Sequence, residues 1–189
     1  MKNFIKLFSL IFLFGLFLAC TSKDKEPVTP QPAPADPQPV VAEKATVIYI
    51  VRHAEKGTNS PTDPDLSAAG QARALVLKDS LNKVPVAAIY STNYKRTQQT
   101  AAPTATVKSL NPVIYDSNDL KALADKILKD NLNQTVLIVG HSNTVLETIE
   151  AFQAQRPVAV VNDSEYNYLF KVTLKENKAP VVEVKRYGK

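Results

Sequence analysis

The chain has 189 residues, of which 23 are basic and 18 acidic, and it contains a single cysteine. The net charge of +5 is mild, and lysine and arginine do not cluster with interleaved aromatic residues, so the composition gives no support to nucleic-acid binding. One cysteine also excludes an intramolecular disulfide.

The first twenty residues predict export and lipid attachment. A short basic start is followed by an apolar run over 7–19. This run is long enough for the core of a signal peptide and shorter than the roughly 20 residues of a membrane-spanning helix. Segment 16–20 resembles a bacterial lipobox, so we expect a signal peptide at 1–19 and a lipid on Cys20. The alternative is a plain signal peptide, or a short anchor helix, with an incidental cysteine.

Residues 20–45 are predicted to form an extended spacer between this lipid anchor and a folded domain. After Cys20 the segment contains six prolines and neither glycine nor an aromatic residue. Such a composition buries too little apolar surface to fold and favours polyproline II. We expect an exported bacterial lipoprotein, attached through Cys20 to the outer membrane and facing the periplasm, with the cell surface as the alternative. Thr21, in place of an aspartate, favours outer-membrane sorting by analogy with known lipoproteins.

Residues 46–189 are predicted to form one α/β domain in which strands and helices alternate. Strands are expected at 47–51, 86–90, 112–115 and 135–139, and a terminal hairpin at 168–174 and 181–187. Helices are expected from Ser67 to about Asn82 and from 93 to about 107, where Pro103 should kink the helix or end it early. A third helix is expected to start at Asn118 or Asp119 and to carry Leu128 on its apolar face, and a fourth is expected from 145 to about 154. The pattern predicts a three-layer sandwich: a mostly parallel sheet with helices on both faces and a C-terminal antiparallel hairpin.

Both histidines of the chain directly follow apolar strands. His53, with Arg52 beside it, follows the strand at 47–51, and His141 follows the strand at 135–139. Arg96 is expected in the first turn of the helix after another strand. The carboxyl ends of parallel strands share one edge of the sheet, where open α/β folds bind ligands. Two guanidiniums and two imidazoles in one crevice predict a site for a tetrahedral dianion such as phosphate.

Four segments resemble the histidine phosphatase superfamily. The sequence RHAE at 52–55 is similar to its RHG/RHA signature, and Ser91 with RTQQTA at 96–101 is similar to its S-x4-R-[AT]-x-Q-T-A segment. The sequence GHS at 140–142 resembles its second-histidine motif, and LSAAG at 66–70 resembles its L-[ST]-x-x-G element. The four segments occur in the order and at the spacing of this superfamily. The short length, and Gly-His-Ser in place of a His-Asp pair, resemble its phosphoglycerate mutase-like branch rather than the larger acid phosphatases and phytases.

The resemblance implies a phosphatase that needs neither metal nor cofactor and acts on a phosphorylated small molecule or phosphoprotein. His53 would take the phosphoryl group from a phosphomonoester or a phosphohistidine, and water would then cleave the phosphoenzyme. Arg52, Arg96 and His141 would bind the phosphoryl oxygens. Asn59 stands where some relatives have an asparagine that contacts phosphate.

The general acid is the part of the family pattern that this sequence lacks. Relatives use a carboxylate after the third strand, often a glutamate, whereas segment 115–119 reads YDSND. Asp116 is the first candidate and Glu55 the second, while Asp119 is expected to cap a helix. A missing or displaced acid favours substrates with good leaving groups, such as phosphohistidine.

Three other functions are compatible with the residues. A lipoprotein could bind phosphorylated ligands without turnover, and a phosphoglycerate mutase-like phosphotransferase is the second alternative, although an exported protein would lack the cytosolic phosphoglycerate pool. The third is a metal site of His53, Glu55 and His141, which two adjacent arginines would disfavour by repelling a cation.

Overall fold

The structure, a computed structural model, describes residues 44–188. A six-stranded sheet forms the centre of the domain. The expected signal peptide, the lipid site at Cys20 and nearly all of the spacer lie outside these residues. The strands are β1 (Ala45–Arg52), β2 (Val86–Ser91), β3 (Val113–Ile114), β4 (Thr135–Gly140), β5 (Tyr168–Lys175) and β6 (Val181–Arg186). The helices are α1 (Ala68–Ser80), α2 (Lys95–Lys108), α3 (Leu120–Asp130) and α4 (Val145–Ala151). Within the described part of the chain, no helix is both long and apolar enough to cross a bilayer.

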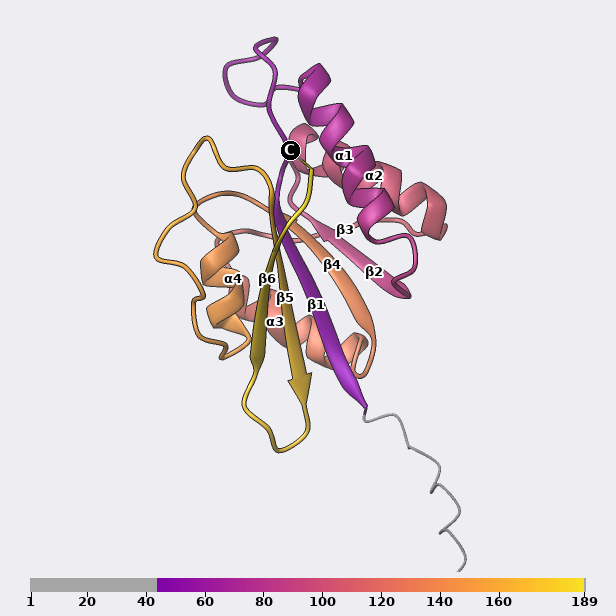
Figure 1. Cartoon of the computed structure of the whole chain (residues 1–189), viewed down its shortest axis with the longest axis vertical. Coiled ribbons are helices and arrows are strands. Elements are labelled where there is room, and N and C mark those ends of the chain that lie inside the picture. Colours follow the sequence, from indigo (N-terminus) through magenta and orange to yellow (C-terminus); the bar gives the residue numbers. More distant parts are fainter. Residues whose placement is uncertain (1–43, 189) are drawn as a thin grey trace, which may run out of the picture. The chain divides into compact units, whose positions relative to one another are not determined.

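The strand order is β3-β2-β4-β1-β5-β6. The four strands from β3 to β1 run parallel, whereas β5 is antiparallel to β1 and β6 is antiparallel to β5. The two parallel strands that precede the histidines, β1 and β4, are therefore central neighbours (Figure 1). This arrangement confirms the predicted mostly parallel sheet with a C-terminal antiparallel hairpin.

Two apolar layers cover the two faces of the sheet, because successive strand residues point to opposite sides. In β1 and β4, Ile48 and Ile138 pack in one layer with side chains of α3 and α4, and Leu137 and Val139 pack in the other with side chains of α1 and α2. Figure 1 shows the helix pairs α1–α2 and α3–α4 on opposite sides of the strands. Burial on both faces explains why these strands read as continuous apolar runs rather than alternating ones.

The helix starts follow the predicted capping residues. The Ser67 hydroxyl accepts a hydrogen bond from the Gly70 N–H (3.1 Å), and the Asp119 carboxylate accepts one from the Ala122 N–H (2.9 Å). Each contact satisfies a backbone donor of the first turn that has no partner within the helix. Asp119 is thus a capping residue, as predicted.

Three expected boundaries are corrected. Helix α2 continues through Pro103 to Lys108, since buried residues on both sides of the proline hold it against the sheet in spite of one missing hydrogen bond. Helix α4 ends at Ala151 rather than near residue 154, because Gln153 adopts a left-handed φ of 58°. The third strand is only Val113–Ile114, paired to the end of β2 at the sheet edge.

Gly70 lets α1 approach the segment that follows β1. A Cβ atom at this position would lie 2.2 Å from the backbone oxygen of Glu55, far inside van der Waals contact. Here glycine is required by the close approach of two backbones. This contact supports the turn after β1, which carries the candidate site.

We expect Gly70→Ala to lower the free energy of unfolding by about 3 kcal/mol, because the added methyl group forces two backbones apart. The comparison is Ala72→Gly on the exposed face of the same helix, which should cost about 1 kcal/mol through helix propensity alone. Urea unfolding of both variants checks this. Equal losses, or a stabilising Gly70→Ala, would contradict the close approach.

Candidate active site

The register of β1 on β4 brings the two histidines together. Arg52 pairs with Gly140, and the next backbone N–H, that of His53, donates to the Gly140 carbonyl (2.9 Å). Both strands therefore end at the same level, and the rings of His53 and His141 lie 5.5 Å apart between centroids at an interplanar angle of 66°. Both side chains are buried. The structure thus assembles the pair whose proximity the sequence predicted.

His53 is held in one tautomer. Its Nδ1 lies 2.7 Å from the carbonyl oxygen of Ala54. A carbonyl can only accept, so Nδ1 carries the proton and Nε2 keeps a free lone pair. Burial, together with the charge of Arg52, lowers the pKa of His53 to about 3, although the hydrogen bond to Ala54 acts in the opposite direction. At neutral pH the ring is an uncharged nucleophile.

His141 is held in the opposite tautomer. Its Nε2 lies 2.9 Å from the Thr92 hydroxyl, and its Nδ1 lies 3.5 Å from Nη2 of Arg96. A guanidinium nitrogen can only donate, so Nδ1 is the acceptor and Nε2–H donates to Thr92. Burial, followed by the charge of Arg96, lowers the pKa of His141 to about 4. Nδ1 is the ring nitrogen that lies next to a cation.

Arg52 joins the end of β1 to a distant loop. Its Nη1 donates to the carbonyls of Asn162 (3.0 Å) and Asp163 (2.9 Å), and the guanidinium carbon lies 4.1 Å from the centre of the Tyr166 ring. Its Nη2 is 3.6 Å from the Asp163 carboxylate. Nε is buried and has no hydrogen-bond partner among the described residues. The guanidinium as a whole lines the cavity described below, so it places a positive charge beside that space.

Arg96 lies in the first turn of α2, as predicted. Its guanidinium carbon lies 4.3 Å from the centre of the Tyr94 ring, and Nη1 is 3.7 Å from the carboxylate of Asp63. That carboxylate also accepts the backbone N–H of Lys95 (3.0 Å). Asp63 therefore connects the loop after β1 to the start of α2 and holds the guanidinium toward His141.

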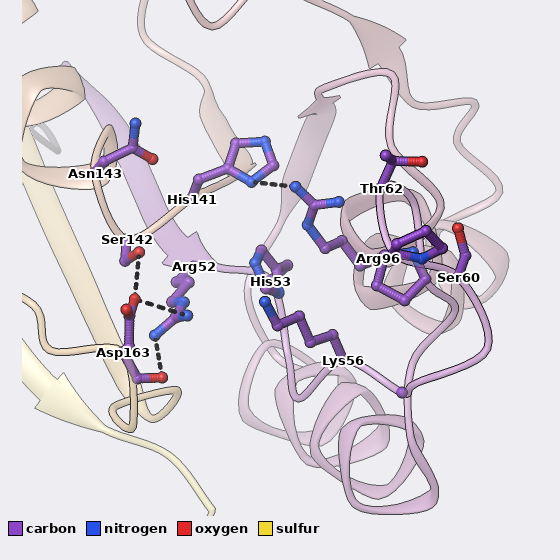
Figure 2. A pocket seen from close by; sticks show the side chains of 13 residues that line it. Arg52, His53, Lys56, Ser60, Thr62, Arg96, His141, Ser142, Asn143 and Asp163 are labelled. Atoms are coloured by element: carbon purple, nitrogen blue, oxygen red, sulfur yellow. Dashed lines mark hydrogen bonds and ion pairs between the residues drawn. The ribbon is translucent and has the colours of Figure 1, made fainter.

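A cavity of about 240 Å³ lies in front of the two rings (Figure 2). Its lining includes both histidines, both arginines, Lys56 and Asp163. The volume is below the range of about 300–1,000 Å³ typical of small-molecule pockets, so it suits a phosphoryl group with a small substituent. The cavity offers several fixed cationic donors and one free ring nitrogen, which is the requirement for transfer of a phosphoryl group to an imidazole.

Glu55 does not belong to this group of residues, which corrects its place as a candidate acid. Both of its carboxylate oxygens bind Arg73 of α1, at 2.6 and 2.9 Å. That ion pair lines a separate hollow beside α1. Its position two residues after His53 put it near the nucleophile in sequence, but the backbone turns the side chain toward α1.

Asp116 also lies outside the cavity. Its exposed carboxylate accepts the backbone N–H of Asn118 (2.9 Å), and it lines a different hollow together with Tyr94. Strand β3 is short and peripheral, so the chain turns at Asp116 before reaching the histidines. The position predicted from relatives is therefore not occupied by this side chain.

Asn59 is not placed against the candidate phosphate site either. Its side chain binds Asp65 within the loop, accepting the Asp65 N–H (3.1 Å) and donating to the Asp65 carboxylate. Gln99 donates to the same carboxylate (2.7 Å) and ties the loop to α2. Asn59 thus organises the loop around the cavity and does not line it.

Several residues at the site were not singled out in the sequence. Thr92 carries a detectable signal, since it directly follows the strand that ends at Ser91. Asp163 carries none, because a loop between α4 and β5 brings it to the site. The described residues contain no group of three or more histidine, cysteine or acidic side chains suited to a metal ion, and the set of His53, Glu55 and His141 is not assembled.

Comparisons with known proteins agree with this geometry. Residues 48–119, which include His53 and Arg96, match the family model of the histidine phosphatase superfamily (branch 1). No curated protein matches the chain. The fold is that of histidine phosphatases, as the solved structures show.

Three of these structures illustrate the likeness. The protein histidine phosphatase SixA, complexed with tungstate, is 15% identical with a TM-score of 0.60, covering 74% of this chain and 96% of that one. A mycobacterial glucosyl-3-phosphoglycerate phosphatase is 12% identical with a TM-score of 0.61, covering 76% and 100%. A phosphoserine phosphatase from Entamoeba histolytica, in complex with 3-phosphoglyceric acid, is 14% identical with a TM-score of 0.56, covering 76% and 98%. At such identities the similarity establishes a shared fold.

We expect neither histidine to titrate between pH 5 and pH 8. Lowered pKa values mean that both rings stay neutral through this range and take up protons only near pH 3 and pH 4. Because the chain has two histidines, NMR of the imidazole nuclei, with His141→Gln for assignment, resolves each ring. A midpoint near 6.5 for either ring would show that it is exposed to solvent rather than buried beside the guanidiniums.

Proposed function

We propose that this protein is a phosphatase of the histidine phosphatase superfamily, which hydrolyses phosphomonoesters or phosphohistidine through a covalent phosphohistidine on His53. The observation that carries the proposal is the free Nε2 of His53, facing a cavity that Arg52, Arg96 and His141 also line. The family match over residues 48–119 and the shared fold support it.

In the first step, Nε2 of His53 attacks phosphorus while the bond to the leaving group breaks. The bonding electrons depart with the leaving atom, and a P–N bond forms. Arg52 and Arg96 offer guanidinium N–H groups to the phosphoryl oxygens, where charge must be stabilised as the bonds change. The bond from Nδ1–H to the Ala54 carbonyl stabilises the positive charge that the ring gains.

In the second step, water attacks the phosphohistidine, inorganic phosphate leaves and the electron pair returns to Nε2. His141 assists at both stages. A dianion beside its Nδ1 opposes the effects of burial and of the arginines, so the bound state favours a proton at Nδ1 that bonds to a phosphoryl oxygen. Thr92 keeps Nε2 in the donor role throughout.

The leaving group receives little assistance from an acid in this scheme. Asp163 is the one carboxylate among the residues that line the cavity; its side chain is 96% exposed and it lies 3.6 Å from Arg52. Leaving groups that depart without strong protonation, such as an imidazole or an acidic phenol, are therefore favoured over simple alcohols. Neither the proposed reaction steps nor the expected preference for leaving groups involves a metal ion.

The lack of a well-placed general acid among the residues that line the cavity also favours one alternative, a lipoprotein that binds phosphorylated ligands without turnover. In that case the arginines and histidines would bind the phosphoryl group of the ligand, and the lack of a general acid at the cavity would have no effect. Measured hydrolysis separates the two functions directly.

We expect His53→Ala to lower the rate of hydrolysis of p-nitrophenyl phosphate by at least about 10³-fold, since the nucleophile is removed. Wild-type protein mixed with labelled phosphate ester and quenched should carry label in an acid-labile, base-stable linkage. Arg96→Ala should lower kcat by about 10²–10³-fold. Arg156→Ala, which removes a cation paired with Glu150 far from the cavity, is the matched control and should change little. Undiminished turnover in His53→Ala would refute the mechanism.

We expect Asp116→Asn to keep kcat/KM within about twofold of the wild type and to leave its pH profile unchanged. The reason is that Asp116 bonds to Asn118 in a separate hollow and does not reach the cavity. Steady-state kinetics with p-nitrophenyl phosphate and with ethyl phosphate measure the effect. A loss above tenfold that is confined to the poorer leaving group would instead identify Asp116 as the acid.

A further inference from the structure

Lys56 is a third cation at the cavity, and the proposed chemistry does not use it. It follows His53 by three positions, and its backbone is fixed by an antiparallel bridge to Leu66. Figure 2 shows its side chain extending toward His53, and both residues line the cavity. Its position is therefore set by the fold, although the side chain itself is exposed.

The three cations differ in their partners. Arg52 has the Asp163 carboxylate at 3.6 Å and Arg96 has the Asp63 carboxylate at 3.7 Å. In the described part of the chain, the Lys56 ammonium has neither an ion pair nor a hydrogen bond. Among the described residues, the ammonium group is thus the one of these three cations that has no carboxylate partner, and it lies beside the space that a substrate would fill.

We propose that Lys56 binds a second anionic group of the substrate, a carboxylate or a further phosphate, on the leaving-group side of the phosphoryl group. The inference rests on the proposed function for the location of the phosphoryl group. Attack from Nε2 of His53 directs the leaving group away from the ring and into the cavity that the exposed Lys56 side chain also lines. An ammonium on a flexible stem binds such a group as a point charge.

The small cavity limits how far the second anion can lie from the first. A volume of about 240 Å³ holds a phosphoryl group and a connector of a few atoms. Among the phosphorylated compounds that the proposed function allows, those with a second negative charge a few atoms from phosphorus are therefore favoured, and those with a cationic substituent are disfavoured by repulsion from Lys56.

The test compares the binding of phosphate esters that share a two-carbon skeleton. It uses the full chain carrying His53→Ala, in which the ligands are not hydrolysed during the measurement. Calorimetry with phosphoglycolate, ethyl phosphate and phosphoethanolamine presents an anionic, a neutral and a cationic substituent. We expect phosphoglycolate to bind about tenfold tighter than ethyl phosphate, and phosphoethanolamine to bind most weakly. Ethylene glycol bisphosphate distinguishes a second phosphate from a carboxylate as the preferred group.

Adding Lys56→Met should remove most of the preference for phosphoglycolate over ethyl phosphate, and Lys56→Arg should retain it. Lys95→Met, which removes the same charge from a nearby exposed position that does not line the cavity, is the matched control and should leave the ratio unchanged. Equal affinities for phosphoglycolate and ethyl phosphate, or a ratio that Lys56→Met does not alter, overturn the inference.

Measuring both hydrolysis by the wild type and the binding preference separates this inference from the phosphatase proposal. Hydrolysis of p-nitrophenyl phosphate by the wild type without the binding preference contradicts the role of Lys56 alone. The binding preference without any hydrolysis contradicts the phosphatase and supports the role of Lys56 in a binding protein.

Discussion

The parallel pairing of β1 with β4 is the constraint on which the rest of the site depends. The pairing places Arg52 opposite Gly140 and lets the His53 N–H bond the Gly140 carbonyl, so two histidines 88 positions apart in sequence begin their loops at the same level. A shift of one residue in a strand exchanges its two faces. The apolar layers on both sides of the sheet make such a shift costly, so the packing of the core also sets the spacing of the imidazoles.

Burial gives this pair its chemical character. Loss of solvent and two nearby guanidiniums both disfavour imidazolium, which keeps the rings neutral and one Nε2 free. The same positive field favours a dianion, whose arrival offsets the repulsion among the cations. The positive charges of Arg52 and Arg96 therefore favour a bound anion at the same place where they disfavour protonated histidine.

The rim is built from two loops that are held by different means. The loop after β1 is tied to α2 through Asp63, Asp65 and Gln99. The loop before β5 is tied to β1 through the guanidinium of Arg52. These loops carry the lysine and the carboxylate that face the opening, Lys56 and Asp163. The arrangement separates a floor formed by the ends of β1 and β4, where phosphoryl chemistry is proposed, from a rim of loop residues, where we propose that substituents are distinguished.

The sequence alone determined the elements that depend on local rules: apolar runs for the central strands, Ser67 and Asp119 as caps, and the position of both histidines and Arg96 at one edge of a mostly parallel sheet. It could not determine where Glu55 and Asp116 point, since an ion pair with Arg73 and a turn at Asn118 decide that. Nor could it reveal Asp163, which a loop without a periodic pattern brings to Arg52. Strand and cap signals lie within a few neighbouring residues, whereas side-chain partners come from distant parts of the chain and exist only once the sheet has formed.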